Sequence, residues 1–217
     1  MGCSSSSPDT HHKEGSQRDF QFSYHPQPPK GLLLEKHTVD HVYDGDTLTI
    51  ENRISVRFWG IDAPEISENE PYAKESRDYC RKLCPRGGTV LLGFSEKNER
   101  HDKYGRTLAY VYVSHPSKSG YICVNMALVE MGLARLYKLR RVKDENTNAM
   151  RDAQKKARRE KRKIWKKVNE DNIVVITRNG EAFHRVGASC VVNASKVTVG
   201  EALDQLYAPC RTCKPLA

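Results

Sequence analysis

The chain has 217 residues, of which 38% are hydrophobic and 29% are charged, a composition typical of a folded protein exposed to water. No apolar run approaches the roughly 20 residues that a helix needs to cross a bilayer, which argues against an integral membrane protein. The formal net charge is +9, and the whole excess lies in residues 31–167, because the segments on either side are neutral. This basic segment predicts a polyanionic partner, with nucleic acid and an anionic membrane as the candidates.

Residues 1–31 are rich in Ser, His, Gln and Pro and show no hydrophobic periodicity, so they predict a disordered tail. Gly2 followed by Ser6 fits the pattern of N-myristoylation, and the neighbouring Cys3 is a candidate for palmitoylation. A tail that begins Met-Gly-Cys by chance is the alternative. If Gly2 and Cys3 are acylated, we expect the protein on the cytoplasmic side of a membrane, and otherwise in the cytoplasm.

Residues 32–167 predict the main domain. Three short apolar-rich runs between residues 32 and 62 are separated by the turn sequences DGD and ENR, which is typical of consecutive strands in a meander. A helix is expected in EPYAKESRDYCRKLC, where Tyr72, Ser76, Tyr79, Cys80 and Leu83 share one face. GGTVLLGFSEK and RTLAYVYVS then predict two more strands, with HDKYG forming the turn between them.

Two further helices complete this domain. VNMALVEMGLARLY predicts the second, and a third is expected from about residue 146 to residue 166. Five strands with one helix inserted and two helices at the end predict an α+β fold, namely a small closed barrel of the oligonucleotide-binding (OB) type with three helices.

Residues 168–217 predict a separate small unit, and a unit of under 50 residues usually needs a metal or a disulfide to fold. His184, Cys190, Cys210 and Cys213 make a reasonable tetrahedral zinc set. The stretch TVGEALDQLYAPCRTCKP resembles a small metal-binding module similar to the Ada N-terminal domain. The gap between His184 and Cys190 is longer than that pattern leads us to expect, so reduced thiols without metal and a disulfide stay open as alternatives.

The turn and strand ends between residues 43 and 65 carry an unusual group of acids. Hydrolysis of a phosphodiester needs oxygen ligands for a hard divalent cation, a base for the attacking water, and cations for the phosphoryl oxygens. The chain supplies carboxylates and two guanidinium groups of these kinds: Asp44, Asp46, Asp62, Glu65, Arg57 and Arg106. Singly, each has an ordinary structural explanation, because DGD is a common hairpin turn and an acid after proline often starts a helix.

Five motifs in order carry a resemblance to a known family. They are DGDT at 44–47, VRFWGIDAPE at 56–65, DKYGR at 102–106, ALVEMGLA at 127–134 and IW at 164–165. Together they resemble the staphylococcal nuclease (thermonuclease) family over about residues 36–167. The resemblance implies an OB-fold nuclease domain, and a calcium-dependent endonuclease that cleaves DNA and RNA with low sequence specificity and leaves 3′-phosphates.

The resemblance also implies the metal ligands. Asp46, Asp62 and the backbone carbonyl of Ala63 correspond to the ligands of one Ca²⁺ per nuclease domain, and Asp44 corresponds to an outer-shell acid that holds a water near the metal. Some members carry threonine where this chain has Ala63, a difference without consequence for a backbone ligand.

Catalytic and substrate-binding positions carry over from the same motifs. Glu65 resembles the general base, and Arg57 and Arg106 resemble the pair that neutralises the phosphoryl oxygens. Tyr104 and Lys103, in DKYG, resemble residues that help to place the substrate phosphate.

Residues 138–167 contain fourteen Lys or Arg against four acids, and the segment could steer nucleic acid, bind an anionic membrane, or simply form a solvated face. The leading hypothesis is a nuclease acting on DNA and RNA, with no obligate protein partner. The alternatives are a membrane-tethered nucleic-acid-binding or adaptor module without hydrolysis, and a lipid-anchored calcium sensor. Substitution of Glu65 or Arg106 distinguishes them, because only an enzyme should lose its rate.

Overall fold

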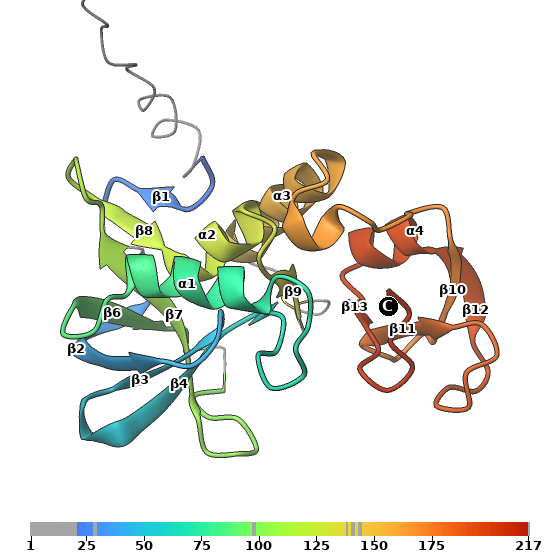
Figure 1. The fold of residues 1–217 in the computed structure, drawn as a ribbon, viewed down its shortest axis with the longest axis horizontal. Coiled ribbons are helices and arrows are strands. Elements are labelled where there is room, and N and C mark those ends of the chain that lie inside the picture. Colours follow the sequence, from blue (N-terminus) through green and yellow to red (C-terminus); the bar gives the residue numbers. More distant parts are fainter. Residues whose placement is uncertain are drawn as a thin grey trace, which may run out of the picture.

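The structure is a computed structural model, and it describes residues 21–27, 30–96, 99–137, 139, 142 and 145–216 (Figure 1). The acylation predicted at Gly2 and Cys3 therefore lies outside the described residues. Over the described part of the chain, no helix has both the length and the apolar character needed to cross a membrane.

Five strands close the barrel of the main domain. They are β2 (Leu33–Val42), β3 (Thr47–Ile50), β4 (Ile54–Phe58), β6 (Thr89–Phe94) and β7 (Thr107–Ser114). β2, β3 and β4 form an antiparallel meander, with the 3-10 turn η1 (Glu51–Arg53) between β3 and β4. β4 then pairs in parallel with β7, and β6 joins β7 to β2 and closes the ring. The OB-type barrel and its opening meander, predicted from short apolar-rich runs separated by turn sequences, are confirmed.

Three helices accompany the barrel, as expected, but the second and third end earlier than the sequence predicted. α1 (Ala73–Leu83) buries Ser76 and Cys80 on its inner face. α2 (Val124–Glu130) is entirely buried, and it ends seven residues before the predicted boundary because Gly132 adopts a left-handed conformation with φ of 70°. A Cβ there would lie 2.7 Å from the backbone oxygen of Arg162, so only glycine fits this turn.

The chain beyond α2 returns to the barrel edge. β9 (Arg135–Leu136) pairs with β5 (Ile61–Asp62), directly after the strand that carries Arg57. α3 (Glu145–Arg159) ends before the predicted boundary at residue 166, because Lys161 and Lys163 have positive φ, and a separate 3-10 turn η2 (Lys163–Trp165) follows. Pairing with β9 places Asp62 beside Arg135.

Residues 21–27, expected within the disordered tail, are part of the barrel domain. β1 (Tyr24–His25) pairs with β8 (Tyr121–Cys123) at the edge of the sheet. The fully buried carboxylate of Glu130 accepts hydrogen bonds from the backbone N–H groups of Gln21 and Phe22, at 2.7 and 3.3 Å, and from the hydroxyl of Ser23 at 3.1 Å. The prediction of disorder is wrong for this segment, because polar bonds to one buried acid hold it rather than a periodic apolar face.

We expect Glu130→Ala to lower the free energy of unfolding by about 2–4 kcal/mol, because it leaves several buried donors without an acceptor. Urea unfolding followed by circular dichroism measures this change. The matched control is Glu99→Ala, which removes an acid from an exposed position and should change stability by less than about 0.5 kcal/mol. Equal stabilities of the two variants would mean that Glu130 does not anchor the N-terminal segment.

The C-terminal residues form a second, four-stranded sheet of order β12-β10-β11-β13 with one helix (Figure 1). Its elements are β10 (Ile173–Ile176), β11 (Ala182–Arg185), β12 (Ser195–Thr198), α4 (Val199–Asp204) and β13 (Ala208–Pro209). Thr198 and Glu201 form a capping box at the start of α4. The core of this unit includes Ala157 and Trp165 of the main domain, so the two units share buried side chains.

Arg158 of α3 joins the units through charge. Its side chain is only 5% exposed, and its guanidinium pairs with Glu170 at 2.5 Å and with Asp204 at 2.7 Å. It also donates to the backbone oxygen of Gly200 at 3.3 Å. The shared core and this ion-pair network fix the C-terminal unit against α3.

Candidate active site

The predicted acids converge at one end of the barrel. Asp44 and Asp46 lie in the turn between β2 and β3, and Arg57 lies on β4, where its register partner is Thr47. Asp62 ends the short strand β5, and Glu65 follows three residues later. The hairpin and the strand exit therefore bring together all the acids that the sequence singled out.

Asp46 is 2% exposed, and both oxygens of its carboxylate have partners. Its carboxylate forms an ion pair with Arg57 and accepts hydrogen bonds from the backbone N–H of Ala63, at 2.5 Å, and from the hydroxyl of Thr47, at 3.1 Å. The backbone N–H of Asp46 in turn donates to Asp44 at 3.1 Å, which fixes the turn. These contacts hold the Asp46 carboxylate in one orientation inside the barrel end.

Asp62 is the centre of a cluster of guanidinium groups and is 4% exposed. Its Oδ1 atom accepts from Arg57 at 3.0 Å and also pairs with Arg211, and its Oδ2 atom accepts from Arg135 at 3.3 Å. Sequence reasoning identified Arg57 but missed Arg135 and Arg211. Both reach Asp62 from distant parts of the chain: Arg135 follows the ALVEMGLA motif, and Arg211 lies inside the CRTC stretch that was interpreted only as a zinc site.

Glu65 lies at the rim of the cluster, about a third exposed, with its backbone N–H bonded to the Glu70 carboxylate at 3.0 Å. Burial, and then the negative charge of Asp44, raise the pKa of Glu65 above its ordinary value. Burial also raises the pKa of Asp44, against the opposing effect of Arg57. A raised pKa makes Glu65 a stronger base than a free carboxylate, as a proton acceptor in catalysis requires.

Arg106 closes the turn between β6 and β7 and is positioned by Asp102. Its Nε donates to Asp102 at 2.7 Å, while the other carboxylate oxygen of Asp102 accepts the backbone N–H groups of Tyr104 and Arg106. Tyr104 is 72% exposed, with Lys103 and Arg106 at 4.9 and 5.6 Å from its ring centre. The turn therefore presents two cations and an exposed aromatic ring, and the role predicted for them in placing a phosphate stays a prediction.

An open cleft of about 630 Å³ connects Arg106 with the acid turn. Its lining runs across β2, β3 and β4 and comprises Asp40, His41, Tyr43, Asp44, Thr47, Thr49, Arg53, Ser55 and Arg106. Tyr43 is exposed and meets His41 edge to face, with ring centres 4.8 Å apart. Sequence reasoning missed these two aromatic side chains, although their place beside DGD was a usable signal.

The carboxylates fit a hard divalent cation. Calcium prefers oxygen ligands, and carboxylates are the commonest that proteins supply. Burial is the main cause of the raised pKa values of Asp44 and Glu65, and a divalent cation bound beside them would favour their charged forms.

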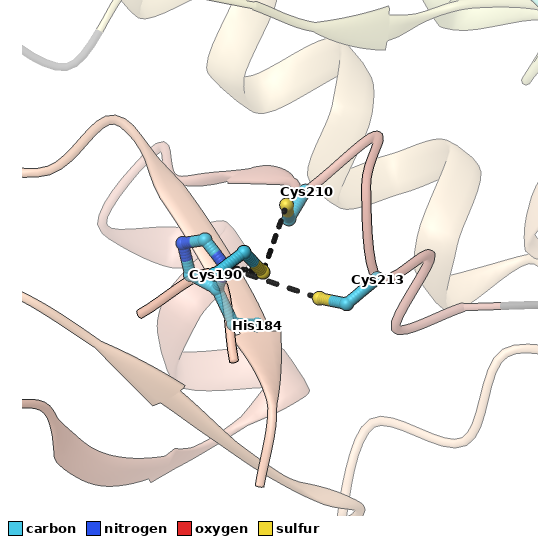
Figure 2. A group of neighbouring side chains, drawn as sticks. All are labelled: His184, Cys190, Cys210 and Cys213. Carbon is cyan, nitrogen blue, oxygen red and sulfur yellow. Dashed lines mark hydrogen bonds between the residues drawn. The ribbon is translucent and has the colours of Figure 1, made fainter. Parts of the chain in front are cut away.

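The predicted His/Cys set also comes together, inside the C-terminal unit (Figure 2). The ligand atoms of His184, Cys190, Cys210 and Cys213 all lie within 4.8 Å of one another. The His184 Nδ1 atom is 3.2 Å from the Cys190 sulfur and 3.8 Å from the Cys213 sulfur, and the sulfurs of Cys190 and Cys210 are 3.9 Å apart. These four residues could therefore hold a metal ion, and the longer gap after His184 does not separate it from the cysteines.

The thiol environment supports the same arrangement. Burial opposes ionisation of Cys210, but hydrogen bonds from the backbone N–H groups of Cys213 and Thr212 and from the side chains of Cys213 and Cys190 together lower the pKa of this thiol. Cys213 accepts the backbone N–H of Arg185 at 3.4 Å. The six cysteines among the described residues are all free thiols, so no disulfide links this set.

The basic segment 138–167 is only partly a solvated surface. Arg158 is buried in the ion pairs with the C-terminal unit, and Arg162 donates to the backbone oxygen of Glu130 at 2.7 Å. Lys156 donates to the side chain of Gln21 at 2.5 Å. These side chains contribute to structure, whereas other basic residues of the segment, such as Lys155 and Arg159, are exposed.

The structure is an OB-type barrel that carries buried carboxylates and arginines at one end, beside an open cleft. Residues 55–167 match the family described as "Staphylococcal nuclease homologue". The chain therefore belongs to the staphylococcal nuclease family, whose enzymes are nuclease hydrolases, as the sequence motifs predicted.

Individual relatives agree with this assignment. The chain is 31% identical to the protein named endonuclease YncB of Bacillus subtilis over 173 residues, covering 76% of this chain and 78% of that protein. It is 33% identical to a thermonuclease of Staphylococcus hyicus over 138 residues, covering 60% of this chain and 76% of the relative. Both similarities support the assignment of a nuclease domain to this chain.

Proposed function

We propose that this protein is a calcium-dependent endonuclease that hydrolyses phosphodiester bonds of DNA and RNA with low sequence specificity and leaves 3′-phosphates. The observation that carries the proposal is the convergence of Asp46, Asp62 and Glu65 with Arg57 at the end of the barrel, next to the cleft that Arg106 lines. The names of the relatives, endonuclease and thermonuclease, support the same reaction class. Exposed Tyr43 and Tyr104 offer ring faces for unpaired bases, which favours stacking over base-edge readout and hence low specificity.

We assign the residues the roles that the family resemblance implies. Asp46, Asp62 and the Ala63 carbonyl would hold one Ca²⁺, with Asp44 in the outer shell, and the ion would supply Lewis-acid stabilisation of the phosphoryl oxygens. Glu65 accepts the proton of the attacking water, which its raised pKa favours. Arg57 and Arg106 donate to the phosphoryl oxygens as negative charge builds there. Lys103 and Tyr104 orient the substrate phosphate at the cleft.

Plasmid cleavage tests this proposal. We expect the full chain to nick supercoiled plasmid and to degrade heat-denatured DNA and RNA in calcium, with at least about a hundredfold lower rate in magnesium or chelator, because magnesium demands a stricter octahedral geometry. Gel electrophoresis measures the rate, and phosphatase treatment followed by end labelling detects 3′-phosphates. A folded protein that cleaves under no metal condition would favour the alternative, a nucleic-acid-binding or adaptor module without hydrolysis.

We further propose that the His/Cys set of the C-terminal unit binds one structural Zn²⁺. For zinc–sulfur bonds of about 2.3 Å and zinc–nitrogen bonds of about 2.0–2.1 Å, tetrahedral geometry separates two sulfurs by about 3.8 Å, and a sulfur from a nitrogen by about 3.6 Å. The sulfurs of Cys190 and Cys210 are 3.9 Å apart, close to the tetrahedral sulfur–sulfur value. The nitrogen of His184 is 3.2 and 3.8 Å from the sulfurs of Cys190 and Cys213, on either side of the tetrahedral sulfur–nitrogen value. The likeness of the unit to an Ada-like module remains a prediction from the sequence.

Membrane association through acylated Gly2 and Cys3 also remains a prediction, and it rests on the N-terminal motif alone. Mass spectrometry of the protein isolated from its own cells tests it. An N-terminal peptide without acyl groups would refute the proposal of a membrane protein on the cytoplasmic side. Nucleic acid would then be the favoured partner of the basic segment.

A further inference from the structure

The C-terminal unit places one arginine directly on the acid cluster of the nuclease domain. Arg211 lies between Cys210 and Cys213 in the loop that ends the His/Cys set. Its guanidinium pairs with Asp62 and lies 3.5 Å from Glu65, although the two acids precede it by 149 and 146 residues. It also lies 5.8 Å from the ring centre of Tyr137, next to β9. Arg211 thus contacts both a proposed calcium ligand and the proposed base.

The position of Arg211 is fixed by its surroundings rather than by a flexible tether. The backbone N–H of Cys210 donates to Phe183 at 2.9 Å, and the Arg185 guanidinium donates to the backbone oxygen of Lys214 at 2.9 Å. The unit that carries the loop shares a core with Trp165 and is joined to α3 through Arg158. The loop is therefore held by hydrogen bonds within a unit that packs against the main domain beside the acid cluster.

A second basic residue of the loop makes a useful comparison. Lys214 pairs with Glu68 at 2.7 Å, and both side chains are about half exposed. Such a pair is weak, because water screens it. Arg211 is similarly exposed, at 57%, but its partner Asp62 is almost completely buried. Water therefore screens the charge of Asp62 much less than it screens the charge of Glu68.

Arg211 uses the oxygens that a divalent cation would need. Asp62 Oδ1 already accepts from Arg57, and the guanidinium of Arg211 adds a further positive charge on the same atom. A cation that binds Asp62 must break the pair with Arg211 and overcome its repulsion. We propose that Arg211 is a positioning residue that competes with the divalent cation for Asp62 and thereby sets the cation affinity of the nuclease site. The inference rests on the proposed function only for the identity of the metal-binding carboxylates.

Isothermal titration calorimetry of the full chain with CaCl₂, without nucleic acid, tests the proposal. We expect Arg211→Gln to bind calcium about three- to tenfold more tightly than the wild type, because one charge-assisted contact no longer has to be broken. Arg211→Lys should fall between them, since it keeps the charge but loses the guanidinium geometry. Lys214→Gln is the matched control: it removes one charge from the same loop and should change the affinity by less than about twofold.

The outcomes separate the possible roles of Arg211. Unchanged or weaker calcium binding in Arg211→Gln would overturn the proposal. So would a loss of oligonucleotide affinity without a shift in calcium affinity, because Arg211 would then be a phosphate contact. Asp46→Asn removes a proposed calcium ligand, so the binding heat that this variant loses is the heat of calcium binding at the nuclease site. Thermal unfolding verifies that each variant is folded. Because calorimetry needs no hydrolysis, a calcium shift without plasmid cleavage would refute the nuclease proposal alone, and cleavage without the shift would refute this inference alone.

Discussion

Glu65→Gln is expected to lower the rate of plasmid cleavage by about 10²–10⁴-fold without loss of the fold, because glutamine keeps the shape of the side chain but cannot accept the proton of the attacking water. Arg106→Ala should cost about 10²–10³-fold, because it removes one donor to the phosphoryl oxygens in the transition state. The structure supports separate roles for the two, since Glu65 lies at the acid cluster and Arg106 is held across the cleft by Asp102.

The measurement is single-turnover cleavage of a labelled oligonucleotide at saturating calcium, which separates chemistry from binding. The matched control is Glu68→Gln in the same loop, whose carboxylate pairs with Lys214 outside the acid cluster, and it should leave the rate within about threefold of the wild type. Losses of less than tenfold at both Glu65 and Arg106 would contradict a hydrolytic site. Unchanged oligonucleotide binding would then agree with the non-hydrolytic binding module.

Removal of the C-terminal metal should have the second large effect. We expect the full chain, purified with a reducing agent, to carry about one zinc per molecule by plasma mass spectrometry, and Cys210→Ala to carry none. The metal-free protein should lose about 3 kcal/mol or more of unfolding free energy, which corresponds to about 6–12 °C in melting temperature for a chain of this size. The physical reason is that one ion would join His184 of β11 to three cysteines from the loops that follow β11 and β13.

Cys80→Ala provides the matched control for the zinc measurement. Cys80 is a buried thiol on the inner face of α1, outside the His/Cys set, so its removal should leave the zinc content unchanged. A protein purified under reducing conditions without stoichiometric zinc, or zinc retained by Cys210→Ala, would refute the site. In that case the alternative of reduced thiols without metal would hold.

The sequence by itself determined the barrel and most of its acid cluster. The strands β2, β3 and β4 follow one another through short turns, so the short apolar-rich runs and the turn sequences DGD and ENR were sufficient to predict them. Asp44, Asp46, Arg57, Asp62 and Glu65 fall within 22 residues of one hairpin and its exit. Local strand geometry therefore brings them together without knowledge of the remaining chain.

Only the tertiary structure decided which distant charges join this cluster. Arg135 and Arg211 meet Asp62 because β9 pairs with β5 and because the C-terminal unit packs on α3, and neither event leaves a local pattern in the sequence. Residues 21–27 escaped prediction for a related reason: the buried carboxylate of Glu130 orders them through hydrogen bonds over more than 100 residues. Periodicity reports which face of an element is apolar, whereas long-range ion pairs depend on how whole units dock.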